Sequence, residues 1–337
     1  MEKRPAKRHP LKNSRAFRNA LLTWFSENAK AHPWRQTRNP WSILVSEIML
    51  QQTTVASVIA NRRFEKFLEE FPDIETIAAA PEAQILRAWE GLGYYNRVRN
   101  LQKTAQTVLT EFQGEFPQDA ATLESLPGIG RYTAGAVSSF AFDQPAPIVD
   151  GNIARVLSRL LDSHLAVDST AGSKIIWESA AALLDPKNPR LFNSALMELG
   201  QTICSPRTPG CLICPVRDFC QTSSPESLPA KKPRQKFVAI DEHALLWLHK
   251  DKILLSPGHD TRRQGFWKLP LRSPEDCAHL EPVSQHKYTI THHKVTLHLY
   301  RQQPQRLLPG EAYHPLASLP DLPIATPVRR ILNKVLP

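Results

Sequence analysis

The feature that most constrains the fold of this 337-residue chain is a long succession of helix patterns in its first two thirds. Apolar residues recur there at helical spacing with stop signals between them. The segments are 14–28, 41–71 with a break inside it, 82–90, 97–112, 131–141, 152–161, 174–184 and 189–203. No stretch among them alternates polar and apolar residues in the way of a half-buried strand. The sequence therefore predicts a mainly α protein whose first domain is all-α.

The last third of the chain has a different composition. Residues 223–337 hold 14 of the 29 prolines, and nine of the twelve histidines lie beyond residue 240. Residues 223–236 combine Pro, Ser and charge without apolar periodicity, which is typical of a linker. Apolar and β-branched runs at 238–248, 252–255 and 286–300 predict strands, and 328–335 predicts a helix. We expect a smaller α+β domain over residues 237–337, as the length also favours two domains.

Charge and hydropathy narrow the classes of partner. The net charge is +10, which favours a polyanion such as nucleic acid. Residues 1–18 carry seven Lys or Arg against Glu2, so this basic arm holds +6 and the other 319 residues hold +4. Such an arm is either a solvated tail or a nucleic-acid contact, and the sequence leaves both open. No apolar run approaches the roughly 20 residues of a bilayer crossing, so we expect no membrane association.

Four cysteines lie within 17 residues in the spacing C-x6-C-x2-C-x5-C, at Cys204, Cys211, Cys214 and Cys220. Four thiolates so close together predict a metal centre. The spacing fits a tetrahedral zinc ion and a [4Fe-4S] cluster equally well. The fifth, Cys277, is expected to be a packing residue. An odd number of cysteines and a basic N-terminus with no apolar segment behind it favour a reducing compartment.

The segment LPGIG at residues 126–130 ends one helix pattern, and RYTAGA at 131–136 begins the next. Gly128 and Gly130 allow a tight turn between two helices. The backbone N–H groups that begin the second helix are free to face an anion. Such a hairpin can hold a DNA phosphate without reading a base, although an ordinary helix turn would have the same pattern.

Two acids lie in opposed sequence environments. Glu47 is surrounded by apolar neighbours, so its carboxyl is expected to be buried, with a raised pKa, and able to carry a proton near neutrality. Asp150 precedes a helix, where backbone N–H groups and the helix dipole favour the ionised form. One proton donor and one fixed anion are the pair that cleaves glycosidic bonds. The alternatives are a structural N-cap for Asp150 and an arginine partner for Glu47.

Five segments carry a resemblance to a known family. They are SEIMLQQT (46–53), WEGLGYYNR (89–97), LPGIGRYTAGA (126–136), VDGN (149–152) and the four-cysteine loop. In this order, over roughly residues 20–222, they resemble the adenine DNA glycosylases (MutY family) of the helix-hairpin-helix superfamily. The resemblance implies a glycosylase domain at residues 19–222, a linker at 223–236 and a Nudix-like domain at 237–337 that reads the lesion.

The resemblance also implies an activity and a set of site residues. The expected reaction is removal of adenine mispaired with 8-oxoguanine or guanine in double-stranded DNA, with a [4Fe-4S] cluster on the four cysteines. By position, Glu47 would protonate the departing adenine and Asp150 would stabilise the oxocarbenium-like sugar, supported by Tyr132 and Asn152. Gln52 and Tyr94 match the positions that wedge into the duplex near the lesion pair. The adenine pocket has its matches at Trp34, Arg35 and Leu50. The chain is expected to be a monomer that acts on the nucleoid in a bacterial cytoplasm.

Tyr132 distinguishes related activities. The endonuclease III type places a Schiff-base lysine at this position, and a tyrosine cannot form that imine. We therefore expect a monofunctional enzyme that leaves the abasic strand intact. The alternatives are a thymine mismatch glycosylase, which resembles only the first domain, and a non-catalytic DNA-binding protein with a structural zinc.

The chain departs from the family at two places. The family often has Glu or Gln beside the asparagine that precedes the cluster, but here Asn193 is followed by Ser194, whose shorter hydroxyl reaches less far. The Phe-Ser-His loop of the lesion reader has its nearest match at residues 290–292, where Thr291 and His292 keep polar groups and Ile290 replaces the ring. No Nudix box is present, so we expect no pyrophosphatase activity.

Overall fold

The computed structural model describes residues 11, 13–233, 237–258, 264–290 and 292–336. Backbone contacts divide the chain into two compact units, which are described separately. Unit 1 comprises Met1–Phe64, Asp73–Glu75 and Lys103–Pro233; unit 2 comprises Glu65–Pro72, Thr76–Gln102 and Arg234–Pro337. The domain boundaries expected from the sequence stay predictions. Most of the basic arm, residues 1–10 and 12, lies outside the described residues.

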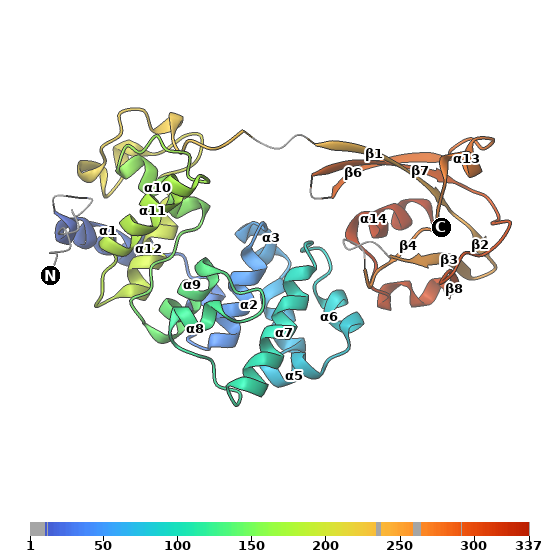
Figure 1. Ribbon diagram of the computed structural model, residues 1–337, viewed down its shortest axis with the longest axis horizontal. Helices are drawn as coiled ribbons and strands as arrows, with labels where there is room; N and C mark the ends of the chain where they lie inside the picture. The colour runs from blue at the N-terminus through green and yellow to red at the C-terminus, as the bar shows by residue number, and fades with distance from the viewer. Residues whose placement is uncertain (1–10, 12, 234–236, 259–263, 291, 337) are drawn as a thin grey trace, which may run out of the picture. The chain divides into compact units, whose positions relative to one another are not determined.

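Unit 1 is built from helices (Figure 1). These are α1 (Ser14–Asn28), η1 (Pro33–Arg35), α2 (Pro40–Leu50), α3 (Val55–Ala60), α8 (Ala120–Glu124), α9 (Arg131–Phe142), α10 (Gly151–Leu160), α11 (Thr170–Leu183), α12 (Pro189–Thr202), η2 (Cys211–Ile213), η3 (Arg217–Phe219) and η4 (Pro225–Ser227). Side-chain caps fix several starts: Asn13 caps α1, Asn39 caps α2 and Ser169 caps α11. The mainly helical expectation is confirmed.

The core of unit 1 joins α1, α10 and α12. Phe17 and Leu21 of α1 are buried with Leu157 of α10 and with Phe192 and Leu196 of α12. This packing fixes the relative positions of α10 and α12. Both helices line the site described below.

The break expected inside segment 41–71 is present. The segment 41–71 is three helices, α2, α3 and α4 (Arg63–Glu70). The break falls after Leu50, where Gln52 takes a left-handed φ of 54° and Thr54 caps α3. The short helices α5 (Ile74–Ala79) and α8 were not predicted because each offers less than two turns of periodicity. The remaining helices of the first 112 residues are α6 (Glu82–Ala88) and α7 (Asn96–Glu111).

Residues 237–336 form the α/β region of unit 2. Its elements are β1 (Val238–Leu245), β2 (Leu248–His249), β3 (Lys252–Pro257), β4 (Trp267–Lys268), β5 (Leu271–Arg272), α13 (Pro274–Cys277), β6 (Ser284–Ile290), β7 (His293–Tyr300), β8 (Ala312–Pro315), η5 (Leu316–Asp321) and α14 (Thr326–Val335). One sheet has the order β5-β1-β7-β6, with β1 parallel to β7; the other has β2-β3-β4, with β8 beside β3. The run predicted as one strand at 286–300 is the antiparallel pair β6 and β7.

A shared core holds the two sheets to the last helix. Ala244 of β1, Ile253 of β3 and Leu299 of β7 are buried with Ile331 and Leu332 of α14. On the other face of the first sheet, Cys277 is buried against Leu245 and Tyr300, which confirms its packing role. The smaller α/β region expected from the sequence is therefore confirmed.

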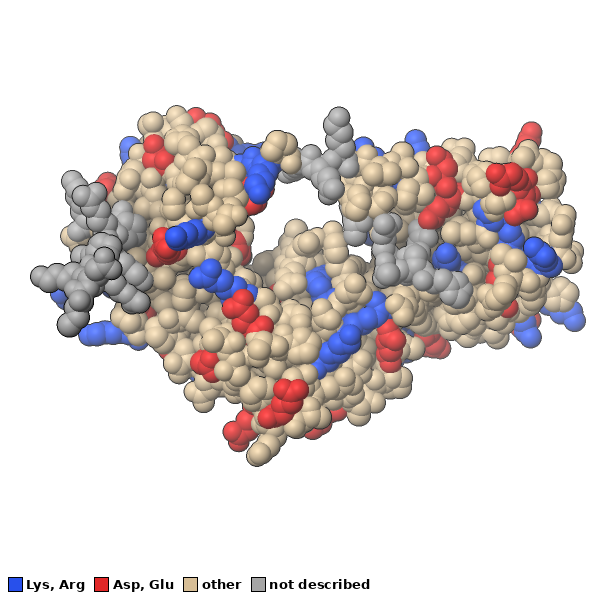
Figure 2. Space-filling view, in the orientation of Figure 1, with Lys and Arg blue, Asp and Glu red and all other residues tan. Residues whose placement is uncertain are grey.

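Two surface properties complete the description. Figure 2 shows Lys and Arg interspersed with Asp and Glu over the visible face. None of the described helices combines the length and the apolar character that a bilayer crossing requires.

Candidate active site

The first acid, Glu47, lies within α2 and is 5% exposed. Its helical neighbours Leu44, Val45 and Ile48 are buried, so little water reaches the carboxyl. The pKa of Glu47 is raised to about 7: burial is the largest cause, a hydrogen bond from Tyr132 opposes the rise, and the charge of Asp150 adds to it. Glu47 therefore holds an exchangeable proton near neutral pH.

Tyr132 anchors this carboxyl from the start of α9. Its hydroxyl donates to Oε2 of Glu47 at 2.7 Å and lies 3.9 Å from Sδ of Met197. Burial and the neighbouring carboxylates hold the pKa of Tyr132 well above its usual value, so the phenol stays a donor. This bond fixes the orientation of Glu47 toward the cavity.

The second acid, Asp150, is the N-cap of α10. Its Oδ1 accepts from the backbone N–H of Ile153 at 2.7 Å, and its Oδ2 accepts from Nδ2 of Asn152 at 2.8 Å. Two donors and the positive end of the helix dipole stabilise a negative charge here. The structure thus bears out the opposed environments predicted for Glu47 and Asp150.

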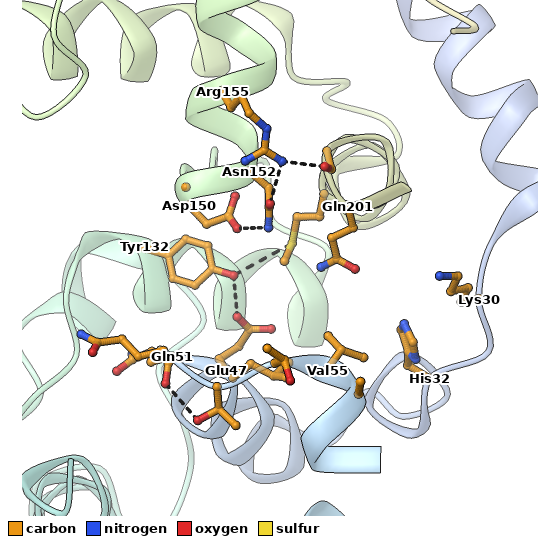
Figure 3. Close-up of a pocket in the computed structure, with 18 of the residues that line it drawn as sticks. Lys30, His32, Glu47, Gln51, Val55, Tyr132, Asp150, Asn152, Arg155 and Gln201 are labelled. Atoms are coloured by element: carbon orange, nitrogen blue, oxygen red, sulfur yellow. Dashed lines mark hydrogen bonds between the residues drawn. The ribbon is translucent and has the colours of Figure 1, made fainter. Parts of the chain in front are cut away.

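Asn152 is held in turn by Arg155 on the same helix. The guanidinium donates to Oδ1 of Asn152 at 3.0 Å, to the carbonyl of Gly200 at 2.6 Å and to that of Cys204 at 2.8 Å. Because Arg155 occupies the Asn152 oxygen, the amide nitrogen is directed to Asp150. Figure 3 shows this chain of hydrogen bonds along one wall of the pocket.

The two acids face one open cavity of about 920 Å³. This is within the usual size range of ligand pockets, about 300–1,000 Å³. It is lined by Glu47, Leu50, Gln52, Tyr132, Asp150 and Asn152 among the residues predicted from the sequence. A smaller adjoining hollow of about 40 Å³ is lined by the predicted residues Trp34, Arg35, Leu50 and Ser194 together with Glu47.

Arg35, which lines the smaller hollow, forms an ion pair with a buried carboxylate behind it. Nη1 of Arg35 lies 2.7 Å from Oε2 of Glu198, whose side chain is fully buried. Arg190 donates to the backbone carbonyls of Arg35 and Thr37 at 2.7 and 2.9 Å. The position of Arg35 is therefore set by both its backbone and its head group.

Several lining residues were not predicted from the sequence, among them Lys30, His32, Arg155, Met197 and Gln201. Helical spacing could have indicated three of them, because Arg155 is three positions after Asn152, and Met197 and Gln201 are three and seven after Ser194. His32, which stacks on Trp34 with ring centroids 5.0 Å apart, has no such signal.

The predicted hairpin is present between α8 and α9. Gly128 has a φ of 74°, a conformation that favours glycine, and Gly130 is the N-cap of α9 without a side-chain cap. Oγ1 of Thr104 donates to the carbonyl of Pro127 at 2.7 Å and steadies the turn. The first N–H groups of α9 are thus available to an anion.

Other predicted binding residues lie in unit 2. Tyr94 is 49% exposed with a φ of 49°, and the guanidinium of Arg97 lies 5.7 Å from its ring centre. His292 is exposed, with its ring 4.0 Å from that of His293. Thr291 lies outside the described residues.

All four clustered cysteines line one cavity of about 290 Å³ at the end of unit 1. Arg159 donates to Sγ of Cys204 at 3.3 Å and to the backbone carbonyls of Cys204, Ser205, Pro206 and Leu228. Burial raises the pKa of Cys214 to about 11, so a positive centre is needed to hold it as a thiolate. Within the described ranges, no three His, Cys, Asp or Glu side chains are placed to share a single ion. A donor set of four thiols around one cavity fits an iron–sulfur cluster.

These features are those of a helix-hairpin-helix repair protein. The family model of the "HhH-GPD superfamily base excision DNA repair protein" matches residues 45–171. The structure is also similar to one described as a thermostable thymine-DNA glycosylase, with a TM-score of 0.56 and 31% identity, covering 62% of this chain and 95% of that one.

Proteins with similar sequences identify the family within this superfamily. An adenine DNA glycosylase of Buchnera aphidicola (subsp. Baizongia pistaciae) is 36% identical over 75% of this chain and 71% of the relative. One of Mus musculus is 42% identical over 61% of this chain. The chain belongs to the adenine DNA glycosylase family. It spans only 41% of the length of the mouse relative.

Proposed function

We propose that this chain is a monofunctional adenine DNA glycosylase that removes adenine mispaired with 8-oxoguanine or guanine. The observation that carries the proposal is the pair Glu47 and Asp150, which line one cavity in opposed environments. The cavity of about 920 Å³ has room for an extruded nucleoside. Because a base inside the duplex cannot reach these acids, the adenosine must leave the stack first.

In the first step Glu47 gives its proton to a ring nitrogen of the adenine. The N-glycosidic bond then breaks, and its electron pair leaves with the base. Tyr132 holds the Glu47 carboxyl at 2.7 Å, so the proton is presented in one direction.

Asp150 acts on the sugar that is left behind. Its carboxylate stabilises the positive charge that develops at C1′, and Asn152 keeps Oδ2 in place at 2.8 Å. A water adds to C1′, and the proton that it loses restores Glu47. The products are free adenine and an abasic site in an intact strand. Tyr132 supports this outcome because a phenol cannot form the imine of a lyase.

DNA is held through contacts that do not depend on sequence. The uncapped N-terminus of α9 behind Gly128 and Gly130 would bind a backbone phosphate. Gln52 and Tyr94, both at left-handed φ values, would wedge into the duplex beside the mispair. Thr291 and His292 of the α/β region, which we propose is Nudix-like, would read the 8-oxoguanine. We expect a monomer that acts on DNA in the bacterial cytoplasm.

Cys204, Cys211, Cys214 and Cys220 would hold a [4Fe-4S] cluster. Bound iron would keep these buried thiols ionised and would cross-link the cysteine loop at the end of unit 1. Arg159 donates to Cys204 and to neighbouring carbonyls, so it orders the loop that surrounds the cluster.

The test uses duplexes with adenine opposite 8-oxoguanine, adenine opposite guanine and thymine opposite guanine, each with and without alkali. We expect release from the two adenine duplexes and strand breakage only after alkali. The similarity to a thymine-DNA glycosylase makes release from the thymine duplex the competing result. Breakage without alkali would show a lyase, and binding without release would favour the non-catalytic, zinc-containing alternative.

A further inference from the structure

The helix α12 presents one face to the pocket. Ser194, Met197 and Gln201 follow one another at spacings of three and four, so they lie on one face of the helix. Ser194 lines the smaller hollow, whereas Met197 and Gln201 line both the hollow and the main cavity. Gln201 therefore stands where the two spaces meet.

The amide of Gln201 has no hydrogen-bond partner among the described residues, and the side chain is exposed. Its polar neighbours are already engaged: Asn152 with Asp150, and Arg35 with Glu198. Figure 3 shows the Gln201 side chain leaving its helix toward the space above Glu47 and Val55. An uncommitted amide is thus placed beside the acid that would meet the base.

We propose that Gln201 recognises the edge of the extruded purine and determines specificity for adenine. This rests on the proposed function. Its oxygen can accept from the exocyclic 6-amino group while its nitrogen donates to the adjacent ring nitrogen, the pairing by which glutamine reads adenine in DNA. Ser194, two turns earlier, carries a single short hydroxyl and lines only the smaller hollow. Gln201 supplies both a donor and an acceptor where the main cavity opens.

The test combines Q201L with removal of the 6-amino group from the substrate. Single-turnover excision of adenine and of unsubstituted purine is measured opposite 8-oxoguanine for both enzymes. Since one bidentate amide–base pair discriminates by about 1–3 kcal/mol, we expect the adenine-to-purine rate ratio to fall about tenfold or more in Q201L. The purine rate should fall less than the adenine rate, because purine keeps the ring nitrogen that accepts from the Gln201 amide but lacks the 6-amino group. A change in both rates by the same factor would indicate a merely structural effect and would overturn the proposal.

Two further variants sharpen the comparison. Q106L makes the same replacement at an exposed helical glutamine outside the pocket and should keep the wild-type ratio. If S194A rather than Q201L lowers the ratio, the reader is Ser194 and the proposal is wrong. Thermal melting confirms that each variant folds.

A binding arm separates this inference from the proposed function. Affinities for adenine and purine duplexes are compared in a Glu47→Gln background with and without Q201L. Loss of the adenine preference on adding Q201L supports the inference even if the wild-type enzyme excises no adenine. An unchanged preference contradicts the inference, and wild-type excision of adenine in the same series would leave the proposed function standing.

Discussion

At the scale of single residues, the proton on Glu47 depends on exclusion of water. Its pKa is raised to about 7, mainly because the carboxyl is buried in α2, and the bond from Tyr132 opposes the rise. The group is neutral in the unfolded chain only below its ordinary pKa, near 4.5. The same burial that supplies a proton donor therefore costs stability once the unfolded chain can ionise.

Replacing Glu47 by Gln should abolish base release while leaving DNA binding. Wild-type excision should fall as pH rises through about 7, because the ionised carboxyl has no proton to give. A flat wild-type profile between pH 6 and 9, or normal release by the variant, would remove Glu47 from the mechanism.

The same variant tests the linkage of stability to pH. The stabilising contribution of the neutral carboxyl is complete below pH 4.5 and is lost as pH rises to about 7, because only the unfolded chain ionises in that window. Glu47→Gln should therefore gain on the order of 3 kcal/mol over wild type above pH 7 and little at pH 4. Urea unfolding at both pH values measures the difference.

At the scale of elements, the site depends on how closely α10 and α12 approach. A Cβ added at Gly200 of α12 would lie 2.8 Å from Cβ of Asn152, closer than two carbons can pack. The absence of a side chain at Gly200 therefore lets α10 and α12 lie close together. At this separation Arg155 can donate both to the carbonyl of Gly200 and to Oδ1 of Asn152.

Gly200→Ala should displace Asn152 and slow excision of adenine by tenfold or more. Overpacking of this kind typically costs about 1–3 kcal/mol of stability. Excision rates and melting temperatures are compared with those of Gly151→Ala, where an added methyl meets open space and melting should not change. If Gly200→Ala excises adenine at the wild-type rate, α10 and α12 can move apart without loss of activity.

The elements also show what the sequence could predict and what it could not. Glu47, Asp150 and the cysteines were found because their meaning is local: an apolar run, a helix start, a short spacing. The pairings Arg35–Glu198 and Arg155–Cys204 join residues 163 and 49 positions apart, so no local pattern indicates them. The break predicted inside segment 41–71 could not be placed at Gln52 from the sequence, because a left-handed φ has no signature at a glutamine. The parallel pairing of β1 with β7 is likewise set by the whole sheet.

At the scale of the whole molecule, charge is unevenly distributed along the chain. Seven of the basic residues lie in residues 1–18, and positive and negative side chains are mixed over the face in Figure 2. A face with both signs interspersed offers little directional attraction for DNA. On the proposed function, directed contacts such as the start of α9 would therefore position the duplex on this protein.

The four-cysteine loop lies at the end of unit 1, and its proposed cluster predicts the metal content of the purified protein. The purified protein should be brown, with about four irons per chain and no zinc, as expected of a four-thiolate cluster. Cys204→Ser should lower the iron content and the melting temperature, because Arg155 and Arg159 of α10 both bond to the Cys204 region. Cys277→Ser, outside the loop, should keep the iron. A colourless protein with one zinc would contradict the cluster.

Tyr132 is the second residue of α9, directly after the uncapped turn at Gly130. The first turn of α9 thus carries both the backbone N–H groups that would bind a phosphate and the phenol that orients Glu47. If a phosphate binds at that turn, its distance from the Glu47 carboxyl is fixed by the first turn of α9. On the proposed function, only the nucleotide at the matching position along the strand would then reach the acid, and its neighbours in the strand would not.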